Sequence, residues 1–171
     1  SYQEWDCGPI YGFQWRHFNA TYTGCNSDYK NKGVDQLLNV IHLLRTNPTS
    51  RRIFMSAWNP GQMKEMALPP CHISYQFYVS EGNKLQCQMY QRSGDMFLGI
   101  PFNIASTALL THIIAKMTDL IPDKIILVVG DAHIYKDHID QVNIQLERKP
   151  YIPPTLIINT KKDNIEDYRA T

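Results

Sequence analysis

Long apolar runs, closely spaced cysteines and clusters of like charge are all missing from this sequence of 171 residues. No apolar stretch reaches the ~20 residues that a membrane-spanning helix needs, so we expect no membrane partner. Seventeen lysines and arginines balance sixteen aspartates and glutamates, and no basic cluster is longer than a pair such as Lys161-Lys162. This balance gives no reason to expect a nucleic acid or an acidic membrane surface as a partner.

The four cysteines show no C-x-x-C spacing; they are Cys7, Cys25, Cys71 and Cys87. Wide spacing in a domain of this size predicts reduced thiols rather than a disulfide framework, and hence a cytoplasmic or nuclear protein. Asp131, His133 and His138 lie close together in the sequence, as metal ligands often do. No fourth ligand or second His/Cys cluster accompanies them, so we expect no metal site.

What the sequence does contain is the composition of one globular domain, with 43% apolar and 11% aromatic residues. Apolar periodicity predicts helices over 34–44, 101–120 and 136–148, and the second is apolar almost all round, which indicates a buried helix. We expect strands over 51–58, 72–79, 84–92, 123–130 and 151–160. Residues 8–18 are predicted to form a turn and an irregular or short extended segment. This mixture predicts an α+β fold with one large sheet.

Cys71 is a candidate nucleophile, although most free cysteines are inert packing residues. A cysteine attacks as the thiolate, so a reactive one needs a neighbouring cation or base. We do not expect His72 to serve, because adjacent residues of a strand point to opposite faces. Arg92, near the end of the strand predicted to pair with that of Cys71, is always charged and can favour the thiolate. The alternative is that Arg92 is a solvated charge at a strand end.

Two other short segments suggest binding. Arg51 and Arg52 place two guanidiniums side by side, which suits a phosphate dianion, although a pair of exposed charges is the alternative. The segment GDAHIY, residues 130–135, follows an apolar strand, and polar residues at a strand end are typical of binding sites.

Several segments run in one order across nearly the whole chain: GPIYGFQWRHF, GVDQL, PTSRRIFMSAWNPGQMKEMALPPCHISYQFYV, LQCQMYQRSGDMFLGIPFNIAS, GDAHIYKDHIDQ and NIEDY. Together they resemble the thymidylate synthase family, and the PPCH and QRSGDMFLGIPFNIAS blocks are the most specific. The resemblance implies a single domain over residues 1–171, with a large mixed twisted sheet packed against helices. It also implies that such sheets pack against each other across a homodimer interface.

By this resemblance the protein is a methyltransferase that converts dUMP to dTMP. The co-substrate would be 5,10-methylenetetrahydrofolate, which donates both the one-carbon unit and a hydride and leaves as dihydrofolate; no metal is implied. Cys71 would add to C6 of the uracil ring, with Arg92 as the nearby cation and Tyr11 close by in a water-bridged network. Arg92 and Ser93 would bind the phosphate of the nucleotide. Arg51 and Arg52 would reach the phosphate in the site of the other subunit.

The resemblance also assigns the remaining candidate site residues. Asn103 matches an amide that reads the pyrimidine, since an amide can both donate and accept. His133 and Tyr135 match the groups that hold the deoxyribose hydroxyl, and Gln91 belongs to the same nucleotide site. The folate is expected to contact Asp95, which also borders the dUMP site, and an apolar wall of Leu98, Gly99 and Phe102.

Some parts of the family pattern have no match in the printed chain: an N-terminal arginine loop, a proton-handling glutamate and a C-terminal segment that closes over the folate. We therefore expect these 171 residues alone to turn over poorly. The alternatives are a dUMP or dCMP hydroxymethylase, and a truncated inactive paralogue acting as an interaction module. Asn103, where a cytosine-specific relative would carry aspartate, favours uracil. The chain could also be the synthase portion of a fused dihydrofolate reductase–thymidylate synthase.

Overall fold

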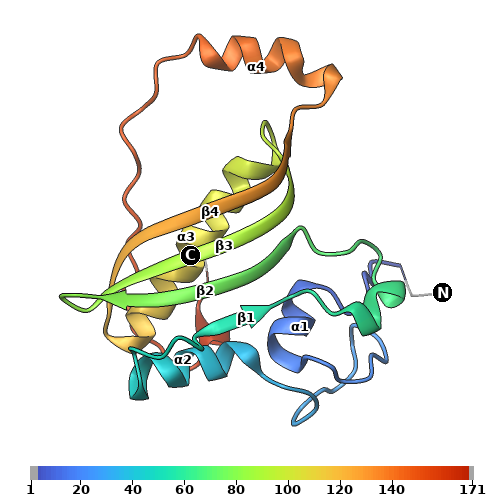
Figure 1. The fold of residues 1–171 in the computed structure, drawn as a ribbon, viewed down its shortest axis with the longest axis vertical. Helices are drawn as coiled ribbons and strands as arrows, with labels where there is room; N and C mark the ends of the chain where they lie inside the picture. Colours follow the sequence, from blue (N-terminus) through green and yellow to red (C-terminus); the bar gives the residue numbers. More distant parts are fainter. Residues whose placement is uncertain (1–3, 170–171) are drawn as a thin grey trace.

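The computed structural model describes residues 4–169, in which one mixed sheet of four strands is covered by helices on a single face (Figure 1). The strands are β1 (Phe54–Ser56), β2 (His72–Ser80), β3 (Lys84–Asp95) and β4 (Ile121–His133), and they lie in the order β1-β2-β3-β4. β1, β2 and β3 pair antiparallel, whereas β3 and β4 pair parallel.

The parallel pair requires a crossover connection, and the longest helix supplies it. The helices are α1 (Tyr11–His17), α2 (Gln36–Thr46), α3 (Gly99–Thr118) and α4 (Ile139–Leu146), with short 3₁₀ helices η1 (Pro60–Glu65), η2 (Lys136–His138) and η3 (Ile165–Asp167). α3 joins β3 to β4 and lies behind the sheet, and α1 and α2 lie below it (Figure 1). α4 stands apart from the sheet, and residues 147–164 return from it without forming a helix or strand.

The hydrophobic core lies between the covered face of the sheet and the helices α2 and α3. Period-two alternation in β2 and β3 sends every second side chain into this core. The buried strand residues are Met55, Tyr75, Phe77, Leu85, Cys87 and Met89, and the helices add Val40, Ile41, Leu44, Ile114, Ala115 and Met117. Burial raises the pKa of Cys87 to about 12, so this thiol stays protonated and packs as an apolar group.

Most predicted elements are confirmed, and the α+β class with a mixed sheet is among them. Five expectations were wrong. Residues 8–18 contain helix α1 rather than an extended segment, and residues 151–160 form no strand. β1 covers only Phe54–Ser56 of the predicted 51–58, and β4 continues to His133 rather than ending at Gly130. The helix over 101–120 exists, but Phe102 is 76% exposed, so α3 is not buried all round.

Tertiary contacts explain why α1 was missed. The helix has only 7 residues and no side-chain N-cap, so neither length nor capping signals it. Its one buried side chain, Gln14, is held by hydrogen bonds to the Pro9 carbonyl and to Gln62, 48 positions away in the sequence. No local pattern contains that information.

Asp35 joins α1 to α2 and offers a stability test. Its Oδ1 accepts the N–H of Leu38 at 2.9 Å as the N-cap of α2, and its Oδ2 accepts Nε of Arg16 at 2.9 Å. We expect Asp35→Ala to lower the free energy of unfolding by about 1–2 kcal/mol, most of it from the lost cap. Asp35→Asn keeps the cap acceptor and removes the charge, so urea unfolding should show a smaller loss. Equal losses in both variants would mean that the ion pair, not the cap, stabilises this junction.

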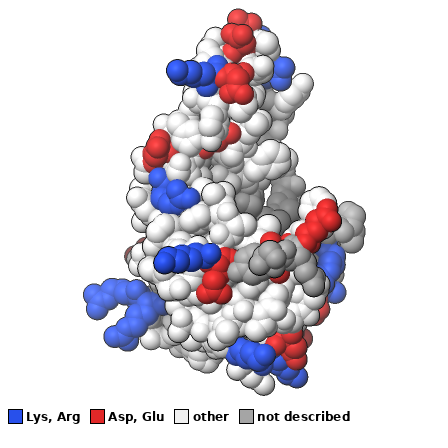
Figure 2. All heavy atoms as spheres, turned by 90° about the vertical axis from the view of Figure 1, so that its right-hand side faces the viewer, with Lys and Arg blue, Asp and Glu red and all other residues white. Residues whose placement is uncertain are grey.

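The charged side chains form no large patch of one sign on the face shown in Figure 2, where lysines and arginines alternate with aspartates and glutamates. Among residues 4–169, no helix combines the length and the apolar character needed to cross a bilayer.

Candidate active site

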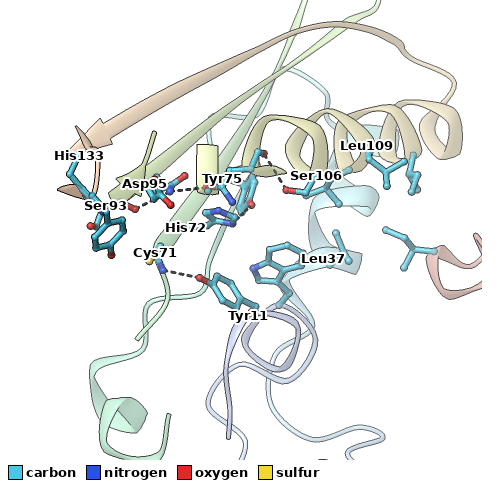
Figure 3. Close-up of a pocket in the computed structure, with 18 residues that line it drawn as sticks. Tyr11, Leu37, Cys71, His72, Tyr75, Ser93, Asp95, Ser106, Leu109 and His133 are labelled. Carbon is cyan, nitrogen blue, oxygen red and sulfur yellow. Dashed lines mark hydrogen bonds between the residues drawn. The ribbon is translucent and has the colours of Figure 1, made fainter. Parts of the chain in front are cut away.

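A cavity of about 800 Å³ opens beside the ends of β3 and β4, between α1 and α3 (Figure 3). One end of it is polar and is lined by Tyr11, Cys71, His72, Gln91, Ser93, Asp95, Asn103, His133 and Tyr135. The other end is mainly apolar and is lined by Trp15, Leu37, Leu109, Leu110, Ile113 and Ile165. Its size is within the range of small-molecule sites.

Cys71 lies at the polar end, immediately before β2, and its thiol faces a guanidinium. Nη2 of Arg92 is 3.8 Å from Sγ of Cys71. The same guanidinium donates to the carbonyls of Pro69 and Pro70, both at 2.9 Å, and the backbone N–H of Arg92 donates to the Cys71 carbonyl. Arg92 therefore both fixes the loop that carries the thiol and places a permanent cation beside it, as in the surroundings of reactive cysteines.

Tyr11, the first residue of α1, reaches the same loop. Its hydroxyl accepts the backbone N–H of Cys71 at 2.9 Å (Figure 3). Burial raises the pKa of Tyr11, although the N–H donated by Cys71 works in the opposite direction, so the phenol stays protonated. The structure thus brings together two residues that are 60 positions apart in the sequence.

His72 lines the cavity together with Cys71, although we expected opposite faces. Cys71 precedes the strand rather than belonging to it, and the pairing of β2 is irregular between His72 and Ser74, so the alternation rule does not apply here. The imidazole does not bond to the thiol; its Nδ1 lies 3.3 Å from the hydroxyl of Tyr75. Burial lowers the pKa of His72, which favours the neutral ring.

Gln91 and Asn103 form a pair of side-chain amides at the centre of the polar end. Nε2 of Gln91 donates to Oδ1 of Asn103 and to the Ser93 carbonyl, both at 2.9 Å. This contact orients the amide of Asn103, which lines the cavity and whose chemistry allows it both to donate to and to accept from a ligand.

The neighbouring ends of β3 and β4 supply three further polar groups. Asp95 pairs with His133 in the parallel register, so the two lie side by side. Oδ1 of Asp95 accepts the N–H of Phe97 at 3.0 Å and thereby shapes the turn into α3. The rings of His133 and Tyr135 meet edge to face, 5.1 Å apart. Polar groups thus gather where these strands end, as the GDAHIY segment suggested.

Five candidate residues do not line the cavity. One of them, Arg92, instead contacts the lining residue Cys71. Arg51 and Arg52 are exposed in the turn between α2 and β1, and Leu98 and Phe102 are exposed at the start of α3. Within residues 4–169 no three His, Cys, Asp or Glu side chains are grouped to hold a metal ion. That His133 and His138 are not ligands stays a prediction.

Several lining residues were not identified from the sequence. Leu109, Leu110 and Ile113 were assigned to a buried helix, but they face the apolar end of the cavity. Trp15 and Ile165 complete that end from opposite ends of the chain. The sequence did carry one signal, because the helix predicted over 101–120 is apolar almost all round. Such a helix can pack one face against the sheet and turn another face toward the cavity.

A thiol held beside a guanidinium, with oriented amides and a carboxylate at one cavity, is an arrangement in an α+β protein that suits the binding of a polar small molecule. The thymidylate synthase family model matches residues 2–171, and the chain belongs to this family.

Relatives from plants, fungi and animals agree with this assignment. The chain is 58% identical over 168 residues to a bifunctional dihydrofolate reductase-thymidylate synthase of Glycine max, covering 98% of this chain and 32% of that protein. It is 55% identical over 174 residues to the thymidylate synthase of Saccharomyces cerevisiae, covering 97% of this chain and 57% of the relative. Against the thymidylate synthase of Homo sapiens it is 56% identical over 168 residues, covering 98% and 53%. The chain therefore spans between about a third and just over half of the length of these relatives.

Proposed function

We propose that this chain carries the catalytic centre of an enzyme that methylates dUMP to dTMP with a methylene folate. The observation that carries the proposal is the 3.8 Å contact between Cys71 Sγ and the Arg92 guanidinium, in a cavity that also holds an oriented asparagine amide. The family membership supports this proposal over the hydroxymethylase and the inactive interaction module.

Cys71 would begin the reaction by bonding to C6 of the pyrimidine. The thiolate supplies the electron pair, and the C5–C6 π electrons move onto C5 and O4, which makes C5 a nucleophile. Asn103 would hold the ring by its O4 and N3–H, so that C6 meets the sulfur in a fixed geometry. After the methylene unit is joined to C5, the C5 proton would leave and the bond between the methylene carbon and the folate nitrogen would break. A hydride from the folate would then reduce that carbon to a methyl group as the Cys71 thiolate departs from C6 and the ring double bond is restored.

The remaining polar groups would bind and orient the nucleotide. Arg92 and Ser93 would contact its phosphate, and Gln91 would keep the Asn103 amide in its reading orientation. His133 and Tyr135 lie together at the end of β4, where they would meet the sugar hydroxyl.

The cavity also fits a folate by its chemistry. Its apolar end can take a flat ring system, and Asp95, which lies beside Ser93 and His133 at the polar end (Figure 3), offers a carboxylate as an acceptor for ring N–H groups. The folate would supply the one-carbon unit and the hydride. Gly99 lines the cavity, whereas Leu98 and Phe102 are exposed beside it, so this wall would be incomplete at the mouth.

The uncovered face of the sheet supports the proposal that two copies form a homodimer. Within residues 4–169, no helix covers the face turned to the viewer in Figure 1. It carries the row Phe54, Gln76, Gln88 and Ile126, in register across all four strands, with Tyr90 and Val128 paired beside it. Exposed apolar faces of this kind mark interaction sites, and a two-fold dimer would bury the same face of both copies. The exposed Arg51 and Arg52 would then reach the phosphate in the partner's site.

The proposed function is tested by following dihydrofolate formation from dUMP and methylenetetrahydrofolate by absorbance, with the full-length protein. Turnover that depends on both substrates supports the proposal. A protein that binds dUMP but forms hydroxymethyl-dUMP instead would support the hydroxymethylase, and a folded dimer that does not bind dUMP would support the interaction module.

The base preference gives a separate prediction. We expect Asn103→Asp to lose dUMP turnover and to gain dCMP binding, because a carboxylate only accepts hydrogen bonds and cytosine presents an amino donor. Leaving a buried group unpaired costs ~1–3 kcal/mol, or roughly 10- to 100-fold in affinity. Isothermal titration with both nucleotides measures this change, and Asn39→Asp, the same amide-to-acid change at an exposed position of α2 outside the cavity, is the control. Unchanged dUMP turnover in Asn103→Asp would show that this amide does not read the ring.

A further inference from the structure

Three buried side-chain amides form a closed hydrogen-bond cluster outside the cavity. Gln14 of α1 is 0% exposed, and Asn59 and Gln62, at the start of η1, are 5% and 7% exposed. Oε1 of Gln62 accepts from Gln14 and from Asn59, both at 2.9 Å, and Oε1 of Gln14 accepts from Asn59 at 3.2 Å. Nε2 of Gln62 donates to the Ala20 carbonyl at 2.8 Å. All three amides thus have partners, and the cluster links α1 to η1.

One hydrogen bond made by this amide cluster spans the segment that contains Tyr11. Nε2 of Gln14 donates to the Pro9 carbonyl at 2.7 Å, so the chain is closed into a tight loop from Pro9 to Gln14 with Tyr11 inside it. Tyr11 has a φ of +25°, a region that residues with side chains rarely occupy. Such a conformation persists only where the surroundings impose it. The bond between Gln14 and Pro9 is the side-chain contact that closes this loop.

A second hydrogen bond, made by Asn59, holds the start of the segment that leads to Cys71. Oδ1 of Asn59 accepts the N–H of Gly61 at 3.2 Å and so starts η1, after which residues 66–70 run to the nucleophile. Along this path the N–H of Ala67 donates to the Cys7 carbonyl, two residues before Pro9. The amide cluster therefore anchors both sides of the 2.9 Å bond between the Tyr11 hydroxyl and the Cys71 N–H.

We propose that Gln14, Asn59 and Gln62 are positioning residues that hold the Tyr11 phenol against the backbone of the nucleophile. The inference rests on the proposed function for its catalytic consequence, but the placement itself can be measured without turnover. A cluster that served only stability would affect the whole fold and would not single out the Cys71 amide.

The first test is hydrogen exchange of the Cys71 amide, measured by NMR on the full-length protein. Tyr11→Phe removes the acceptor and should speed exchange of this amide about tenfold, the equivalent of one lost hydrogen bond. Gln14→Met, which has nearly the same volume and no amide, should speed it by a similar factor while amides of β2 and β3 keep their rates. The control is Met117→Ala, which opens a cavity in the core away from the amide cluster. Its effect should spread over β2 and β3 and not be selective for Cys71.

A conservative pair covers the case in which Gln14→Met does not fold. Gln62→Glu retains the oxygen that accepts from Gln14 and Asn59. Because burial favours the protonated carboxyl, this side chain can still donate to the Ala20 carbonyl and should keep the slow exchange of the Cys71 amide. Gln62→Met removes that oxygen and should lose the slow exchange. Folded Gln14→Met or Gln62→Met protein with a wild-type exchange rate at Cys71 would overturn the proposal.

The second test is a double-mutant cycle on the rate of covalent adduct formation with fluoro-dUMP and the methylene folate. Gln14→Met should slow the reaction about tenfold in the Tyr11 protein and less than about twofold in the Tyr11→Phe protein, since residues that act together are not additive. Equal factors in both backgrounds would contradict action through Tyr11. If the wild-type protein forms no adduct, the proposed function fails, and the exchange rates alone decide the placement.

Discussion

Cys71→Ser protein is expected to lose turnover by about 10⁴-fold or more, because removing a catalytic nucleophile leaves only binding and orientation. A serine hydroxyl is a much weaker nucleophile than a thiol at its free pKa, and Arg92, which faces this position, cannot accept a proton from it. The affinity for dUMP should change little, since the groups assigned to the nucleotide remain in place. Steady-state kinetics and nucleotide titration on the same preparation measure both effects.

The covalent adduct identifies the nucleophile directly. Fluoro-dUMP with the methylene folate should trap one adduct per site, and peptide mass spectrometry should locate it on Cys71. Cys25→Ser is the matched control, because Cys25 is also a free thiol and lies outside the cavity. An adduct on Cys25 or on the buried Cys87 would contradict the assignment, as would full turnover by Cys71→Ser protein.

Local pattern was sufficient for the elements that build the core. The alternation in β2 and β3 predicted the hairpin, and Tyr75, Phe77, Cys87 and Met89 do face the core. The apolar period predicted α2 and α3, whose core faces are buried. These elements follow from side-chain burial, which acts at the short spacings that a sequence displays.

The candidate site could be predicted only in part, because its contacts join distant segments. The suggestion that Arg92 supports Cys71 followed from strand pairing, and the two do lie side by side. Tyr11 came from the resemblance alone, since no spacing rule connects it with Cys71. The amide cluster was missed because polar glutamine and asparagine in loops give no sign of burial. Residues 151–160 show the opposite error, because a strand was predicted there and none forms. A strand-like composition does not produce a strand unless the edge of a sheet lies beside it to pair with.

The largest gain of activity is expected from mixing two inactive proteins. Arg51 and Arg52 do not line the cavity of their own chain, and no ion pair among residues 4–169 involves either guanidinium. Two exposed arginines side by side, with no ion-pair partner in the described part of their own subunit, suit a phosphate held by the other subunit. Arg51→Ala/Arg52→Ala protein should therefore bind dUMP weakly although its Cys71 is intact, whereas Cys71→Ala protein should bind dUMP but not react.

Subunit exchange between these two proteins should restore about a quarter of the wild-type activity. Random mixing makes half of the dimers mixed, and each mixed dimer has one site that combines an intact cysteine with arginines from its partner. Native mass spectrometry measures the fraction of mixed dimers, and activity should rise with this fraction. Cys71→Ala protein taken alone through the same exchange procedure is the blank. Mixed dimers without activity would place the arginines in the site of their own chain, which would require a movement of the turn between α2 and β1. Recovery without any mixed dimers would contradict the shared site just as directly, because only exchange can bring the intact parts together.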